Sequence, residues 1–175
     1  MEKLVDEGKA KSIGVSNFNA AQVARILKVA RVKPVLNQVE CHAYFQQRKL
    51  ERVLLKDNIR LMAYGPIGSP GSTAALTVPG ESPPPVLLAD PVIAKLATKY
   101  QKTPAQILIR NLLQRELIVI PKSVTPSRIR ENGNVFDFEL SPEDTAVIEN
   151  IDTDQRMFKY HIMVHAPDFP FNIPV

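Results

Sequence analysis

Two fixed positive charges and two hydroxyl groups fall close together late in the chain. Lys122 and Arg128 supply the charges, and Ser123 and Thr125 supply the hydroxyls. Thr125 precedes Pro126, the pairing that marks a helix start, where free backbone N–H groups add a positive dipole end. Fixed charge with short donors is what a phosphate requires. The spacing predicts a phosphate-binding loop; the alternative is a basic loop in solvent.

The other reactive side chains do not form a recognisable catalytic or metal pattern. His42, His161 and His165 lack the spacing of metal ligands, although Glu40, Cys41 and His42 superficially resemble a ligand set. Successive side chains of a strand point to opposite faces, so adjacent residues rarely share a metal. We predict no metal site. Cys41 is expected to be a small buried residue, and no nucleophile–base pair stands out.

The elements that must position the phosphate loop alternate between strand and helix. Apolar periodicity predicts helices at 20–30 and 48–57, and a capping residue before proline predicts helix starts at Asp90, Thr103, Thr125 and Ser141. Strands are expected at 12–16, 35–40, 59–64 and 117–121, the last rich in β-branched residues and expected to be buried on both faces. Such alternation implies parallel strands, either as half of an eight-unit barrel or as a small doubly wound sheet. A GxGxxG phosphate turn is absent, which disfavours the Rossmann interpretation.

Composition limits the classes of protein that fit. The chain has 175 residues, 45% hydrophobic and 23% charged, with one cysteine, which suits one globular domain in the reducing cytoplasm. No membrane span or signal peptide is evident. The net charge of +4 is spread thinly without interleaved aromatic residues, so we expect no nucleic-acid partner. A long Gly- and Pro-rich connection at 65–89 is predicted to be functional.

Several segments closely resemble the aldo-keto reductases. They are KSIGVSNF (11–18), NQVECH (37–42), AYGPIGS (63–69), IPKSVTPSRIRENGNV (120–135) and DFPFN (168–172). The resemblance implies an (α/β)8 barrel that reduces aldehydes and ketones with NADPH. It places residues 1–175 in the C-terminal half of that barrel, starting in the helix before the fifth strand, with 152–175 as a tail like the family's substrate loops. The family's catalytic Asp, Tyr, Lys and His lie on the first four units, so this chain is expected to contain no catalytic residue and to be inactive alone.

The resemblance also assigns NADP contacts. Lys122, Ser123, Thr125 and Arg128 would hold the adenosine 2′-phosphate, and Glu131 and Asn132 the adenine. Ser16, Asn17 and Gln38 would bind the nicotinamide carboxamide, Tyr64 would stack on its ring, and the following turn would approach the pyrophosphate. The expected cofactor-binding set is Ser16, Asn17, Gln38, Tyr64, Gly65, Pro66, Ile67, Ser69, Ile120, Pro121, Lys122, Ser123, Val124, Thr125, Arg128, Glu131 and Asn132.

Two departures from the family pattern predict weaker local rigidity. Ala43 stands where the family usually has proline, and Gly133 stands where it usually has a bulky aliphatic residue; glycine costs about 1 kcal/mol in a helix interior.

Two functions remain open: part of a carbonyl reductase, or an inactive NADP-binding or interaction module. The substrate of the intact parent would be a small carbonyl compound. Phe158, Tyr160, Met163 and Phe169 are candidates for an apolar pocket, with core or tail packing as the alternative. Unpaired edges of a half-barrel also predict self-association.

Overall fold

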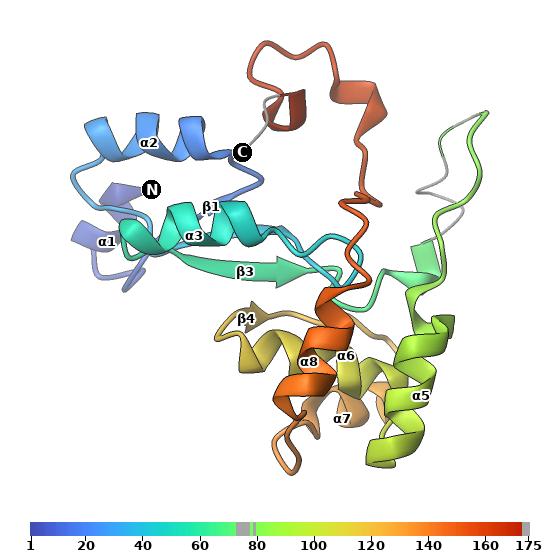
Figure 1. The fold of residues 1–175 in the computed structure, drawn as a ribbon. Helices are drawn as coiled ribbons and strands as arrows, with labels where there is room; N and C mark the ends of the chain where they lie inside the picture. The colour runs from blue at the N-terminus through green and yellow to red at the C-terminus, as the bar shows by residue number, and fades with distance from the viewer. Residues whose placement is uncertain (73–77, 79, 173–175) are drawn as a thin grey trace. The chain divides into compact units, whose positions relative to one another are not determined.

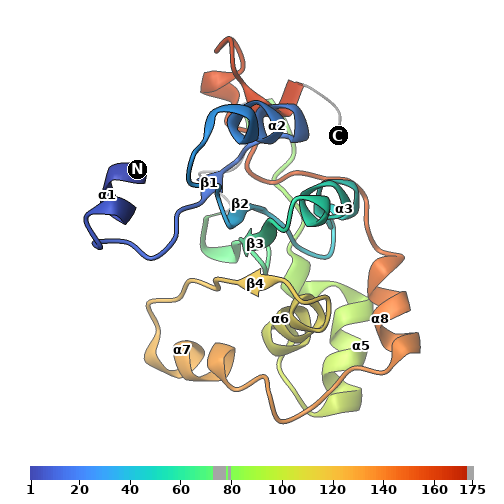
Figure 2. The same ribbon diagram turned by 90° about the vertical axis from the view of Figure 1, so that its left-hand side faces the viewer.

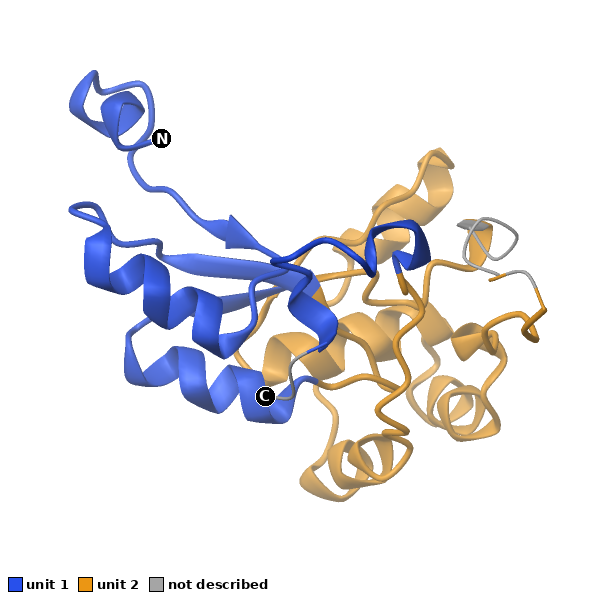
Figure 3. Ribbon diagram, turned by 90° about the horizontal axis from the view of Figure 1, so that it is seen from above, with its two compact units in different colours: residues 1–39, 47–62, 160–175 blue, residues 40–46, 63–159 orange. Residues whose placement is uncertain are grey.

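The computed structural model describes residues 1–72, 78 and 80–172. Part of the predicted 65–89 connection and the last residues of the 152–175 tail therefore lie outside the described residues. The chain divides into two compact units (Figure 3). The first comprises residues 1–39, 47–62 and 160–175, and the second comprises residues 40–46 and 63–159.

Strands and helices alternate along the chain (Figure 1), and the four strands pair in the order β1-β2-β3-β4 (Figure 2), as the parallel α/β prediction requires. They are β1 (Val15–Ser16), β2 (Leu36–Glu40), β3 (Arg60–Tyr64) and β4 (Ile118–Val119). β1 and β2 are parallel, with Val15 opposite Asn37 and Ser16 opposite Gln38. Each observed strand lies inside a predicted one, so the alternation was read correctly and the strand lengths were overestimated for β1 and β4.

The first unit also contains the helices α1 (Glu2–Asp6), α2 (Ala20–Val29) and α3 (Arg48–Lys56). Asn19 and Gln22 form a reciprocal capping box at the start of α2. α2 and α3 contact each other, and Val23 of α2 with Leu50 and Leu54 of α3 are buried. The apolar faces predicted for both helices are therefore the packed ones.

The C-terminal tail of the first unit, with 3₁₀ helices η3 (His161–Met163) and η4 (Pro170–Asn172), returns to the start of α2. The Nδ2 of Asn19 donates to the Pro170 carbonyl at 3.0 Å, and the Nε2 of Gln22 donates to the Asp168 carbonyl at 2.7 Å. Arg25 and Asp168 form an ion pair at 3.0 Å. The capping residues of α2 thus also anchor the tail.

The second unit contains the 3₁₀ helices η1 (Pro70–Ser72) and η2 (Leu87–Ala89) and the helices α5 (Pro91–Tyr100), α6 (Pro104–Gln114), α7 (Pro126–Gly133) and α8 (Pro142–Glu149). All four α-helices start at the predicted prolines. Asp90, Thr103 and Ser141 accept capping hydrogen bonds through their side chains. Thr125 occupies the same position before α7, but its side chain makes no capping bond.

The core of the second unit is centred on α5, which packs against α6 and α8 (Figure 2) and against η2. Ile93 and Ile148 are fully buried, and Ile107 and Leu108 of α6 are at most 1% exposed. Met157 and Leu87 join the same cluster. This core holds the start of α6 and the segment around Met157, both of which border the site described below.

Two sequence-based expectations are wrong in the second unit. Segment 117–121 is not a strand buried on both faces, because Ile118 and Ile120 are each 38% exposed. Among the described strands β4 ends the order, and the Ile120 N–H donates to the Ala63 carbonyl of β3 at 3.2 Å. Gly133 is the last residue of α7 and not an interior one, so the helix-interior penalty does not apply to it.

Candidate functional site

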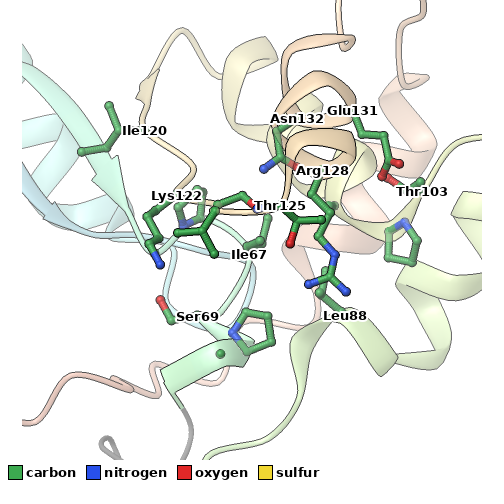
Figure 4. A pocket seen from close by; sticks show the side chains of 18 of the residues that line it. Ile67, Ser69, Leu88, Thr103, Ile120, Lys122, Thr125, Arg128, Glu131 and Asn132 are labelled. Atoms are coloured by element: carbon green, nitrogen blue, oxygen red, sulfur yellow. The ribbon is translucent and has the colours of Figure 1, made fainter.

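A cavity of about 680 Å³ opens within the second unit. Its walls are formed by the turn after β3, by η2, by the start of α6 and by the segment from Ile120 to Asn132 (Figure 4). Phe158 also lines it. The predicted cofactor residues that line it are Tyr64, Gly65, Pro66, Ile67, Ser69, Ile120, Lys122, Ser123, Val124, Thr125, Arg128, Glu131 and Asn132. Segments more than fifty residues apart in sequence are therefore brought to one cavity.

The remaining predicted residues lie elsewhere. Pro121 lines a second cavity of about 710 Å³ beside Ile129 and Phe136. Ser16, Asn17 and Gln38 belong to the first unit, where the Ser16 hydroxyl donates to the Gln38 carbonyl at 2.9 Å. The Asn17 side-chain oxygen is buried and has no hydrogen-bond partner among the described residues.

Positive charge enters the first cavity from two directions. Lys122 comes from the loop after β4 and Arg128 from the first turns of α7, and both side chains are exposed and reach into the cavity (Figure 4). Glu131 is the one acidic side chain among the lining residues. The lining thus carries a net positive charge, which favours an anionic ligand.

The loop between the two cations presents further donors. The Ser123 hydroxyl oxygen accepts the Thr125 N–H at 3.2 Å, which leaves the hydroxyl proton available to donate. The Thr125 side chain does not cap α7, Pro126 has no N–H, and the Ile129 N–H donates to the Thr125 carbonyl at 3.0 Å. The Ser127 and Arg128 N–H groups are therefore the first-turn donors that a ligand could use. The arrangement suits a phosphate held by charge and by hydrogen bonds together.

The opposite wall is a glycine turn that a larger residue would disrupt. Gly65 has φ +60 and Gly68 φ +76, and the Gly68 N–H donates to the Gly65 carbonyl at 2.9 Å. A Cβ on Gly65 would lie 3.2 Å from the Phe158 ring and 3.3 Å from the Ser69 hydroxyl. Glycine therefore permits both the left-handed turn and the close approach of Phe158.

Phe158 is the tail residue that completes this wall. Its ring meets Tyr64 edge to face, with centroids 5.3 Å apart and planes at 84°. The predicted grouping of Phe158 with Tyr160, Met163 and Phe169 does not occur at this cavity. Phe169 and Tyr160 instead contact Phe171 in the first unit, as the tail-packing alternative describes.

Sequence reasoning missed Gln106 as a supporting residue. Its Nε2 donates to the carbonyls of Glu131 at 3.2 Å and Asn134 at 2.8 Å, at the end of α7. Its Oε1 accepts the Thr103 N–H at 2.9 Å. The local signal was the Thr-x-x-Gln spacing of a capping box, which reveals the cap but not the contact with α7. Pro70, Gly71, Leu88, Thr103, Pro104 and Ala105 also line the cavity without having been predicted.

The three residues at 40–42 behave as follows. Cys41 is fully buried, as predicted, and its thiol donates to the Gln46 carbonyl at 3.4 Å. Glu40 and His42 lie on the same side and contact each other at 3.0 Å.

Across residues 1–72, 78 and 80–172, no three His, Cys, Asp or Glu side chains are grouped as a metal site needs. No helix in that described part is both long and apolar enough to cross a bilayer.

Comparison with known proteins identifies extensive similarity. Residues 1–153 match the model of the Aldo/keto reductase family. The chain is 51% identical over 156 residues to Aldo-keto reductase family 1 member A1-A of Danio rerio, covering 89% of this chain and 47% of that protein. It is 44% identical over 183 residues to Aldo-keto reductase family 1 member A1 of Gallus gallus, covering 99% and 54%.

A solved structure, the aldose reductase from Schistosoma japonicum, superposes with a TM-score of 0.87 at 41% identity and covers 100% of this chain and 52% of that one. The chain thus spans about half the length of the relatives it matches.

Proposed function

The chain belongs to the aldo/keto reductase family, and we propose that it supplies the NADP-binding part of an enzyme that reduces aldehydes and ketones to alcohols. The convergence of Lys122 and Arg128 on one cavity, with the first turn of α7 beside them, carries this proposal. Fixed charges in that setting favour the 2′-phosphate that distinguishes NADP from NAD.

We further propose that the chain corresponds to the C-terminal half of an (α/β)8 barrel. Its four consecutive strand units and its coverage of about half of each relative support a half-barrel. Residues 1–175 are then one partial oxidoreductase domain, and 152–175 its substrate-loop-like tail. A free buried thiol at Cys41 suits the cytoplasmic location that we propose for it.

The cavity of the second unit suits the adenosine and pyrophosphate part of NADP. The cavity volume of about 680 Å³ falls within the roughly 300–1,000 Å³ of small-ligand sites. Lys122, Ser123, Thr125 and Arg128 would hold the 2′-phosphate, with Glu131 and Asn132 at the adenine. The turn Gly65, Pro66, Ile67 and Ser69 would face the pyrophosphate, and Ile120, Pro121 and Val124 complete the cofactor loop.

The nicotinamide end rests on separate observations. The partnerless buried oxygen of Asn17 is an acceptor that a carboxamide N–H would satisfy. The Ser16 hydroxyl oxygen and the Gln38 side chain would complete that amide contact. Tyr64 would offer a ring face to the nicotinamide.

The chemistry is divided between this chain and residues outside it. When bound, NADPH supplies the hydride that reduces the carbonyl carbon. The residues named above would bind and orient the cofactor. We propose that the general acid and its Asp, Lys and His partners lie outside this chain, and that the substrate is a small carbonyl compound.

We also propose that the chain associates with a second copy of itself. Ile120 and Ile129 line the second cavity together with Phe136, which is 75% exposed, and Ile118 is exposed on β4. Burying such side chains against a partner is favourable by about 25 cal/mol per Å² of apolar surface. A terminal strand with exposed aliphatic residues is also a template for pairing.

Arg128→Ala tests the cofactor proposal. Loss of one charge-assisted contact costs about 1.5–3 kcal/mol, so the dissociation constant for NADPH should rise roughly 10- to 150-fold while that for NADH stays nearly constant. Fluorescence titration of the 175-residue chain with both cofactors measures this. Arg130→Ala is the matched control, because Arg130 is exposed on the same helix but does not line the cavity. Equal losses for NADH and NADPH, or an equal effect of Arg130→Ala, contradict the assignment.

A further inference from the structure

A carboxylate is buried at the end of β2, and three of the residues that contact it lie more than a hundred positions further along the chain. Glu40 is fully buried. One of its oxygens accepts the Met157 N–H at 2.6 Å, and the other accepts the Phe158 N–H at 3.2 Å. His42 approaches through Nε2 at 3.0 Å and Arg156 through Nη1 at 3.4 Å. Because an isolated buried carboxylate is strongly unfavourable, these donors are what allow it to stay there.

The bonds of Glu40 hold the backbone at the start of the tail. Both N–H groups belong to consecutive residues, so two charge-assisted bonds fix the orientation of one peptide segment. The Met157 side chain is 2% exposed in the core of the second unit. The Arg156 guanidinium lies 4.5 Å from the centre of the Phe45 ring, a contact that restrains the segment further.

This restraint places the Phe158 ring at the cavity. Phe158 lines the cavity and contacts Tyr64 edge to face. Gly65 leaves room for the ring, since a Cβ there would stand 3.2 Å from it. The ring is thus set between a backbone held by Glu40 and a turn that only glycine permits.

We propose that Glu40 is a positioning residue that acts through Phe158. Phe158 in turn determines the space and the aromatic contact that a flat ligand ring finds beside Tyr64. This inference rests on the proposed function, because the ring in question is the nicotinamide of NADP. Phe158 limits the room beside Tyr64 and adds an aromatic contact at that end. Lys122 and Arg128 act at the phosphate end, so the two sets of residues should affect different parts of the cofactor.

The test compares two ligands that share the 2′-phosphate. NADPH carries the nicotinamide, and 2′-phospho-ADP-ribose does not. In the 175-residue chain, Phe158→Ala should weaken NADPH binding about 2- to 10-fold, the range of one aromatic contact. It should leave the dissociation constant of 2′-phospho-ADP-ribose unchanged. Glu40→Gln should do the same, because the glutamine amide has one acceptor oxygen where the carboxylate has two, and it lacks the negative charge that pairs with Arg156.

A double variant separates positioning from general stabilisation. If Glu40 acts through Phe158, adding Glu40→Gln to Phe158→Ala should not weaken NADPH binding further. Glu139→Gln, which removes an exposed carboxylate of the same unit, should change neither ligand. Should Glu40→Gln fail to fold, Phe158→Ala and Phe158→Leu still test the role of the ring.

The outcomes distinguish this inference from the proposed function. If neither ligand binds the unmodified chain, the proposed function fails, and the inference fails with it. If both ligands bind but Phe158→Ala leaves their affinity ratio unchanged, the inference is overturned while the cofactor assignment stands. Additive losses in the double variant, or equal losses for both ligands, overturn the positioning role of Glu40.

Discussion

Gln106→Ala should loosen the helix that carries Arg128 although the two side chains need not touch. Gln106 is 6% exposed, at the third position of α6. The substitution removes its two donated bonds to the Glu131 and Asn134 carbonyls and the bond it accepts from Thr103. The end of α7 then loses its tie to the buried start of α6.

The magnitude follows from those three bonds. Each contributes about 0.5–1.5 kcal/mol to stability. α7 is exposed apart from Asn132, so the carbonyls that Gln106 releases can bind water instead. We therefore expect the free energy of unfolding to fall by about 2 kcal/mol, near the lower end of the range for three hydrogen bonds. Urea unfolding followed by circular dichroism measures this free energy, provided that the slope with urea is unchanged.

Ligand binding isolates the functional part of this prediction. Gln106→Glu keeps the acceptor for the Thr103 N–H but removes the donor to α7. It should therefore weaken NADPH binding severalfold, more than NADH binding, while the cap of α6 survives. Gln155→Ala, at an exposed glutamine of the same unit, is the matched control. A loss below about 0.5 kcal/mol in Gln106→Ala together with unchanged NADPH affinity would refute the role given to Gln106.

Three further predictions concern pH, association and activity. Hydrogen bonds donated by Lys99, the larger effect, and by Tyr100 lower the pKa of the Asp144 carboxyl. The stability that these bonds add is therefore present above about pH 4 and is lost as the pH falls through the lowered pKa. Thermal melts between neutral and acid pH should show this loss. The melting temperature of Asp144→Asn should be lower at neutral pH and should change less as the pH falls. Light scattering after size-exclusion chromatography should find self-association that Phe136→Asp reduces, whereas a monomer with a sharp melt would contradict it. The pure chain should not oxidise NADPH above background with a panel of carbonyl compounds, and a rate proportional to protein concentration would disprove the division of residues proposed above.

Local rules were sufficient for the helix starts and for most of the cation-bearing wall of the cavity in the second unit. Proline after Asp90, Thr103, Thr125 or Ser141 restricts the backbone within a few residues, so each start was predictable without knowledge of the fold. The same holds for Lys122 to Arg128, because the loop and the first turn of α7 are continuous in sequence. The exposure of Ile118 was not predictable in this way, since a β-branched run is compatible with either a central or a terminal strand.

The sequence by itself determined the alternation of strands and helices, the caps and the set of polar groups that we propose hold NADP. Only the tertiary structure decided that Phe158 stands beside Tyr64, that Gln106 holds the end of α7, and that Glu40 binds the backbone of a segment 117 residues further along the chain. The physical reason is distance along the chain. Capping and periodicity depend on neighbours one to four residues apart, whereas a buried carboxylate or an aromatic wall depends on where packing brings two remote segments together.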